Sequence, residues 1–307
     1  MNPEEICQEI DHLKFEKEAI ILAHNYQRPE VQDVADYVGD SIELARRAMN
    51  EKEAKILVVA AVDFMAENAF LLNPSKKVLI PSLNARCPMA RMLSLDDIKS
   101  YRRKYSGVPL ILYVNTFAEA KARCDVCCTS ANAVKIVERV NSDTVIFGPD
   151  CNLAEYIQEK TEKKVIPIPE GGFCPTHLAF DKENILRLKE EYPEAMVLVH
   201  PECTREVRQI ADFVGSTSQI IRYSKEAART KTFIIGTEEG ILHRLNKENP
   251  GKEFILAHMA GVCPNMKRNT LESIYISLKE EIFPVTIPQR IASKARLALE
   301  RMFELSK

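Results

Sequence analysis

The sequence is short of glycine, has no excess of charge of either sign and lacks the common nucleotide-binding motifs. Its 307 residues include only 10 glycines, where about 7% is usual, and neither a GxGxxG nor a Walker A motif occurs. A familiar dinucleotide-binding or P-loop fold is therefore not expected. Lys and Arg number 42 against 44 Asp and Glu, so no global basic field is available to hold nucleic acid.

Long apolar stretches are also missing. The longest apolar run covers Ile56–Val62, far short of the roughly 20 residues that span a membrane. The first residues, Met1–Glu5, are acidic and have no apolar core, so no signal peptide is expected. These features predict a cytoplasmic location. In a reducing compartment the 9 cysteines are expected to be thiols, metal ligands or catalytic groups, not structural disulfides.

Helical and strand patterns alternate along the chain. The first part contains an amphipathic segment, Glu4–Lys17, and a short apolar strand, Ala19–Ala23. One or two helices are expected in Val34–Asn50, and strands at Lys55–Ala60 and Val78–Ile80. This order predicts an α/β fold in which helices flank parallel sheets.

The same pattern occurs three times. Each copy has three landmarks: a residue at the end of its first strand, a hydroxyl residue before a helical pattern, and a cysteine after its last strand. The landmarks are His24, Tyr113 and His200; Ser41, Ser130 and Thr217; and Cys87, Cys174 and Cys263. The first two sets are spaced by 89 and 87 residues, and the cysteines by 87 and 89. This register predicts three copies of one αβα unit, each too long for a solenoid repeat.

The three units are expected to surround a pseudo-threefold axis with a central active site, because open α/β sheets bind ligands at the carboxyl ends of their strands. The predicted units are residues 1–92, 93–181 and 182–269. Residues 270–307 lie outside the repeat. Helices are expected there at Leu271–Lys279 and Gln289–Leu305, packed back on the body.

The three equivalent cysteines point to a metal site. If the sheet edges face the axis, Cys87, Cys174 and Cys263 converge on one point. Three thiolates would suit zinc with an open fourth position, or an iron–sulfur cluster in which one iron has no protein ligand. The alternative is that they only pack equivalent loops, as free cysteines often do; three in register favour the metal.

The hydroxyl set has a structural and a functional interpretation. Ser41, Ser130 and Thr217 each precede a helical pattern, so an ordinary N-cap role is expected for at least one of them. Three helix N-termini aimed at one axis would also offer N–H groups and hydroxyls to a phosphate or to carboxylates.

Residues that follow the first strands are candidates for acid–base chemistry. The pairs are His24 and Tyr26, Tyr113 and Asn115, and His200 and Glu202. A lone histidine after a strand is more often structural, but two at equivalent positions, one with a nearby carboxylate, favour proton transfer. Residues two apart on an extended segment face the same side, so His200 and Glu202 are expected to address one substrate. His177, three residues after Cys174, could ligate the metal, bind substrate or orient a ligand.

A CxxC motif lies in the second unit. Cys124 and Cys127, followed by Cys128, invite a zinc or redox interpretation. No second CxxC exists to complete a four-cysteine zinc site, and the motif falls in the segment that leads to Ser130. A packing role is therefore favoured.

Several segments carry a resemblance to a known family. They include Ala23–Gln27 (AHNYQ), Phe64–Glu67 (FMAE), Thr129–Ala133 (TSANA), His200–Cys203 (HPEC) and Cys263–Lys267 (CPNMK). In this order they resemble the quinolinate synthase A family, iron–sulfur transferases of de novo NAD (pyridine nucleotide) biosynthesis. The family is known for three similar αβα domains around a central site, which agrees with the repeat.

The resemblance implies a [4Fe–4S] cluster on Cys87, Cys174 and Cys263, with one iron open to substrate as a Lewis acid in dehydration. It implies that iminoaspartate condenses with dihydroxyacetone phosphate to give quinolinate, phosphate and water. An oxidase or a dehydrogenase would supply iminoaspartate, with a transient link to this chain expected. No nucleic acid or membrane partner is implied.

The resemblance also implies roles for individual side chains. The catalytic residues would be Glu202, Tyr26 and His200, with Glu202 and Tyr26 transferring protons. The substrate-binding residues would be His24, Ser41, Tyr113, Asn115, Ser130, His177 and Thr217. Of these, His24, Ser41 and Ser130 would hold phosphate or carboxylate.

Some positions depart from the commoner bacterial pattern, and other functions remain open. Asp63 stands where histidine is frequent, and the loop around Cys87 lacks the usual preceding glycine. Neither change removes an implied ligand. The alternatives are a three-cysteine zinc hydrolase or lyase that acts on a phosphorylated small molecule, and a non-catalytic iron–sulfur carrier.

Overall fold

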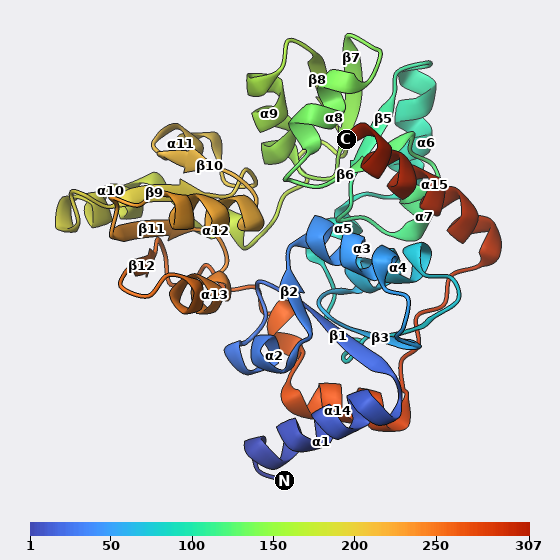
Figure 1. Cartoon of the computed structure of the whole chain (residues 1–307). Coiled ribbons are helices and arrows are strands. Elements are labelled where there is room, and N and C mark those ends of the chain that lie inside the picture. Colours follow the sequence, from blue (N-terminus) through green and yellow to red (C-terminus); the bar gives the residue numbers. More distant parts are fainter.

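The computed structural model describes residues 1–307 and contains three four-stranded sheets (Figure 1). The first sheet has β1 (Ala19–His24), β2 (Tyr37–Gly39), β3 (Ile56–Ala60) and β4 (Lys77–Leu79). The second has β5 (Leu110–Tyr113), β6 (Val126–Cys128), β7 (Thr144–Gly148) and β8 (Lys164–Pro167). The third has β9 (Met196–Val199), β10 (Phe213–Val214), β11 (Thr232–Gly236) and β12 (Glu253–Leu256).

All three sheets have the same topology. In each, the first strand lies between the second and the third, the fourth strand is at the far edge, and every pair is parallel. The predicted α/β fold of three αβα units is confirmed. The strands lie within residues 1–92, 93–181 and 182–269, and these boundaries, like the threefold axis, stay predictions.

Helices connect and cover the strands. In the first unit they are α1 (Pro3–Glu16), α2 (Pro29–Val34), α3 (Ser41–Asn50), α4 (Asp63–Leu72) and α5 (Pro88–Met92). In the second they are α6 (Leu95–Lys104), α7 (Ala118–Lys121), α8 (Ala133–Arg139), α9 (Cys151–Lys160) and the 3₁₀ turn η1 (His177–Ala179). In the third they are α10 (Lys182–Glu191), α11 (Arg205–Gln209), α12 (Thr217–Glu226), α13 (Ile241–Glu248) and the 3₁₀ turn η2 (Met266–Arg268). The chain ends with α14 (Leu271–Glu280) and α15 (Gln289–Leu305).

The central strands are apolar along their whole length because helices cover both faces of each sheet. All five residues of β3 and all four of β5 are buried, the pattern of a parallel sheet rather than a half-exposed one. In each unit the aspartate directly before the second strand accepts a backbone N–H of the first strand at 2.7 Å. These pairs are Ile21 with Asp36, Leu110 with Asp125, and Val197 with Asp212. The repeat therefore extends to individual hydrogen bonds.

The two C-terminal helices lie against the units. Helix α14 packs on α1 and β3, and the long α15 packs on α4, α7 and β6, between the first two sheets (Figure 1). Its buried stripe, Ala292, Ala295, Ala298, Leu299 and Met302, has helical spacing and joins the largest hydrophobic core. These contacts tie the tail to the first and second units.

One predicted element differs. The segment Val34–Asn50 contains the last residue of α2 and the whole of α3, but the strand β2 between them was not expected. This strand has three residues at a sheet edge, too few to show a period of two. No helix is both long and apolar enough to cross a membrane.

Candidate active site

The loops at the carboxyl ends of the three sheets line one cavity. Its volume is about 140 Å³. Every residue named in the sequence as a ligand, catalytic or binding candidate lies in its wall. These are Cys87, Cys174, Cys263, Glu202, Tyr26, His200, His24, Ser41, Tyr113, Asn115, Ser130, His177 and Thr217. Their individual roles stay predictions.

The three cysteines reach the cavity from equivalent loops. Cys87 precedes α5, Cys174 precedes η1 and Cys263 precedes η2. All three are free thiols, and burial raises the pKa of each. A bound cation would be needed to hold them as thiolates at neutral pH. No fourth cysteine lines the cavity.

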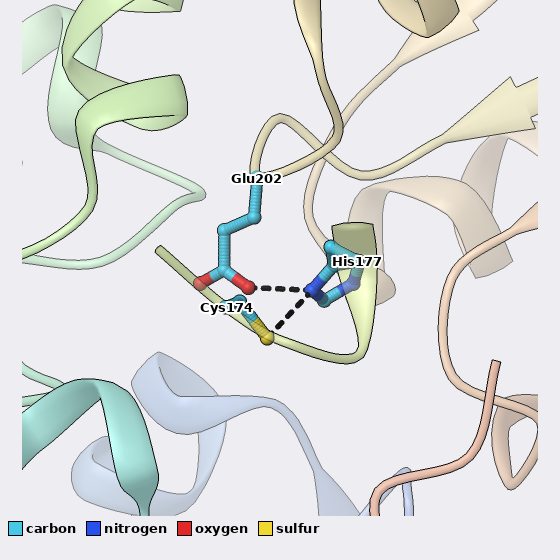
Figure 2. Close-up of side chains that lie close together, drawn as sticks. All are labelled: Cys174, His177 and Glu202. Carbon is cyan, nitrogen blue, oxygen red and sulfur yellow. Dashed lines mark hydrogen bonds and ion pairs between the residues drawn. The ribbon is translucent and has the colours of Figure 1, made fainter. Parts of the chain in front are cut away.

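Cys174, His177 and Glu202 form a tight group in this wall (Figure 2). His177 Nδ1 lies 2.6 Å from Glu202 Oε2 and 3.1 Å from Cys174 Sγ. A carboxylate can only accept, so Nδ1 of His177 carries a proton and donates it to Glu202. The group is therefore a buried histidine–carboxylate pair with a thiol beside it.

A chain of hydrogen bonds extends from this pair. His177 Nε2 lies 2.9 Å from Thr237 Oγ1, and Thr237 Oγ1 lies 2.6 Å from the Tyr26 hydroxyl. With the His177 proton on Nδ1, Thr237 donates to Nε2 and accepts from Tyr26. The four side chains are buried, so the sequence Tyr26–Thr237–His177–Glu202 is shielded from bulk water.

Burial and the neighbouring histidines set the charge of Glu202. Burial alone raises the pKa of this carboxyl, but His177 and His200 outweigh it and lower the pKa to about 2. Glu202 is thus an ionised carboxylate at neutral pH. Its Oε2 faces His177, whereas Oε1 is buried without a hydrogen-bond partner. Buried oxygens are rarely left unpaired, so Oε1 is available to a ligand.

Two other histidines are neutral donors. Burial lowers the pKa of His24 to about 4 and that of His200 to about 3. The Nδ1 atom of each accepts a nearby backbone N–H, from Tyr26 at 3.1 Å and from Glu202 at 3.3 Å. In each ring Nε2 therefore carries the proton. For His200 it faces Ser130 Oγ at 3.2 Å.

The N-cap prediction for the hydroxyl residues is wrong. Helix α3 is capped by Asp40 and α12 by Ser216, each in a capping box, so Ser41 and Thr217 are the first helical residues. Helix α8 begins after Asn132, two residues beyond Ser130. In α3 and α12 the side chain of the N-cap residue accepts the backbone N–H of the third helical residue. The hydroxyls of Ser41, Ser130 and Thr217 are consequently spared for the cavity, although Thr217 also accepts from Asn25 at 3.0 Å.

Sequence reasoning missed Thr237 and the cavity residue Glu238. Both follow β11, the third strand of its unit, and reach the same sheet edge as the first strand. A search for polar residues after third strands would have found them. In the CxxC motif, Cys124 Sγ lies 3.8 Å from Cys127 Sγ, and neither residue lines the cavity.

The chain is similar to known proteins over almost its whole length. Residues 8–304 match the family described as quinolinate synthetase A protein. The chain belongs to the quinolinate synthetase A family. Quinolinate synthases of Thermotoga petrophila, Pyrococcus horikoshii and Methanothermobacter thermautotrophicus are 52%, 50% and 49% identical to it. These alignments cover 98%, 99% and 98% of this chain, and 99%, 100% and 99% of the relatives.

Membership of the quinolinate synthetase A family confirms the resemblance found in the sequence. The family match runs through all three sheets and nearly to the end of α15. The residues that line the cavity all fall within the matched region, and each of the three units contributes some of them.

Proposed function

We propose that this cavity is where the chain acts as a quinolinate synthase. The reaction joins iminoaspartate to dihydroxyacetone phosphate and yields quinolinate, phosphate and water. The observation that carries the function is identity of about half of all residues with quinolinate synthases, over nearly the whole of both chains. The cavity supports it, because its polar groups suit two anionic substrates and several proton transfers.

A [4Fe–4S] cluster on Cys87, Cys174 and Cys263 is part of the proposal. The donor set fits, because three free thiols from three units line one cavity that offers no fourth cysteine. Three protein ligands leave one iron of such a cluster open. When bound, the cluster would supply a Lewis acid for dehydration.

The hydroxyl residues and His24 are proposed to hold the anionic groups of the substrates. Ser41 and Thr217 stand at the first turns of α3 and α12, where free N–H groups and the helix dipole favour phosphate or carboxylate. His24 adds a neutral Nε2–H donor. Asn115 Oδ1 is buried without a partner and is suited to accept an N–H of the imine or amine.

Glu202 and Tyr26 are proposed to move the protons. Glu202 is ionised at neutral pH, and its unpartnered Oε1 can accept a proton from a ligand. Burial raises the pKa of Tyr26, so its phenol stays protonated. Thr237 and His177 connect the two groups through hydrogen bonds that donate from Tyr26 towards Glu202. A proton can therefore pass from Tyr26 towards Glu202 without entering bulk water. His200 holds Ser130 and stacks on His177, with ring centroids 4.5 Å apart.

The proposal also covers the supply of iminoaspartate, the location of the protein and the bounds of its units. An oxidase or a dehydrogenase would supply the unstable iminoaspartate, which favours a transient link between the two enzymes. A cytoplasmic location is proposed because all 9 cysteines are free thiols. The three units are proposed to be residues 1–92, 93–181 and 182–269, with residues 270–307 as a packed tail.

The test is a metal and turnover assay on protein purified without oxygen. About four irons and four acid-labile sulfides per chain, with quinolinate formed from the two substrates, are expected. One zinc and no sulfide would favour instead a three-cysteine zinc hydrolase or lyase, with the zinc on Cys87, Cys174 and Cys263. A full cluster without quinolinate formation would favour an iron–sulfur carrier.

A further inference from the structure

The backbone amides of two proposed cluster cysteines are held by carboxylates. The Cys87 N–H donates to Asp63 Oδ1 at 3.0 Å, and the Cys263 N–H donates to Glu238 Oε1 at 2.9 Å. In the second unit the corresponding carboxylate, Asp150, accepts the Leu153 N–H at 2.7 Å instead. Each of these three carboxylates comes from the segment directly after the third strand of its unit, β3, β7 or β11. The loops of Cys87 and Cys263 are thus anchored in the same way.

A backbone hydrogen bond holds each loop two residues before its cysteine. The carbonyls of Ala85, Gly172 and Gly261 accept backbone N–H groups at 2.8, 2.7 and 2.9 Å. The three donors are Asp63, Cys151 and Glu239, in the same order. In the first unit the carboxylate belongs to the donor residue itself, and in the other two it belongs to the residue before. The loops of Cys87 and Cys263 are therefore each fixed at two points to the start of the helix that follows the third strand.

A carboxylate is a costly acceptor at such a place. Glu238 is fully buried, and a buried carboxylate pays a desolvation penalty that a neutral amide acceptor avoids. A cation accompanies each of the two carboxylates: Lys267 lies 3.0 Å from Glu238, and Arg91 lies 3.7 Å from Asp63. A charged acceptor holds an N–H more strongly than a neutral one, which suits a loop that must not open.

We propose that Asp63 and Glu238 are positioning residues, whose bonds to the amides of Cys87 and Cys263 keep these two thiols preorganised for the cluster. The inference rests on the proposed [4Fe–4S] cluster and adds the groups that retain it. A cluster with three protein ligands is lost when one loop opens. The rate of loss should therefore depend on how firmly each cysteine amide is held.

The test compares Asp63→Ala with Asp63→Asn in the full-length protein, reconstituted anaerobically with iron and sulfide. Asparagine keeps an oxygen that can accept the Cys87 N–H, whereas alanine removes it. Release of iron to a ferrous chelator and the decay of the visible absorption of the cluster are followed together. Release from Asp63→Ala should be about tenfold faster than from wild type, equivalent to about 1.4 kcal/mol of lost loop stabilisation. Asp63→Asn should stay within about threefold of wild type.

Asp36→Ala is the matched control. Asp36 also accepts a backbone N–H, that of Ile21 at 2.7 Å, but it lies directly before the second strand of the same sheet and not after the third. It should lower the melting temperature and leave iron release unchanged. If Asp63→Ala does not fold, Glu238→Ala and Glu238→Gln provide the same comparison at Cys263.

The outcomes separate this inference from the function on which it rests. Wild-type iron release from the alanine variants would overturn the positioning role while leaving the cluster in place. Equally fast release from Asp36→Ala would also overturn it, because the effect would then be general loss of stability. Wild-type protein that takes up no iron and sulfide would instead overturn the cluster itself.

Discussion

His177 and Glu202 meet across 2.6 Å, Nδ1 to Oε2, although they belong to different repeat units. His177 lies in η1, after the last strand of the second sheet, and Glu202 follows the first strand of the third (Figure 2). Tyr26, at the other end of the hydrogen-bonded chain, belongs to the first unit, and Thr237 to the third. The proposed proton-transfer groups therefore come together only where all three units meet.

Glu202→Gln should retain the cluster and lose most turnover. Glutamine is nearly isosteric but cannot act as a base, and kcat should fall by about 10²–10⁴, the usual contribution of a general base. Iron and sulfide content and quinolinate formation should be measured on the same sample. Glu206→Gln, an exposed residue on α11, is the matched control and should behave as wild type. Substantial activity in Glu202→Gln would move the base to another residue.

Thr237→Val should uncouple Tyr26 from His177. Valine has nearly the shape of threonine but neither donates to His177 Nε2 nor accepts from the Tyr26 hydroxyl. We expect kcat to fall by about tenfold or more, with KM changed little, since Thr237 does not line the cavity. Thr237→Ser, which restores the hydroxyl, should recover most of the activity. A valine variant with wild-type kcat would show that the hydrogen-bonded chain carries no proton in the rate-limiting step.

Much of this site could be predicted from the sequence, because residues that follow parallel strands lie at the same edge of the sheet. Three cysteines in register, each after a final strand, had to reach equivalent edges once the repeat was recognised. The landmarks His24, Tyr113 and His200 reached the cavity for the same reason. Local periodicity and spacing were sufficient for these positions.

The features that were missed depend on contacts that periodicity does not describe. Thr237 acts through Tyr26 and His177, which lie 211 and 60 residues away along the chain. The short strand β2 is recognisable only by its pairing with β1. Serine and threonine commonly cap helices, but next to Ser41 and Thr217 the residues Asp40 and Ser216 stand one position earlier and make the capping bonds. These hydrogen bonds, and not the general preference of serine and threonine for caps, decide at which residue each helix begins.

Cys174→Ala should abolish the cluster. Removal of one of three ligands leaves two, too few to hold a cubane in a cavity without another cysteine. Iron and sulfide per chain should fall to background after anaerobic reconstitution, and the same is expected for Cys87→Ala and Cys263→Ala. Cys7→Ala is the control, because Cys7 lies on α1 away from the cavity wall. Full iron in Cys174→Ala would show that the ligand assignment is wrong.

The apoprotein should lose stability as the pH falls from about 6.5 towards 4, partly through His24. Burial lowers the folded-state pKa of His24 to about 4, against about 6.5 in an unfolded chain. Between these values the unfolded state binds more protons, so acid favours unfolding, and the stabilisation is complete only above pH 6.5. At pH 5 this single group should account for a loss of about 2 kcal/mol relative to pH 7.

Urea unfolding at both pH values should show a smaller difference in His24→Gln than in wild type. His12→Gln, at an exposed position of α1, should keep the wild-type difference. An unchanged pH dependence in His24→Gln would mean that His24 is not held neutral by burial, and its proposed role as a neutral donor to the substrate would then have to be withdrawn.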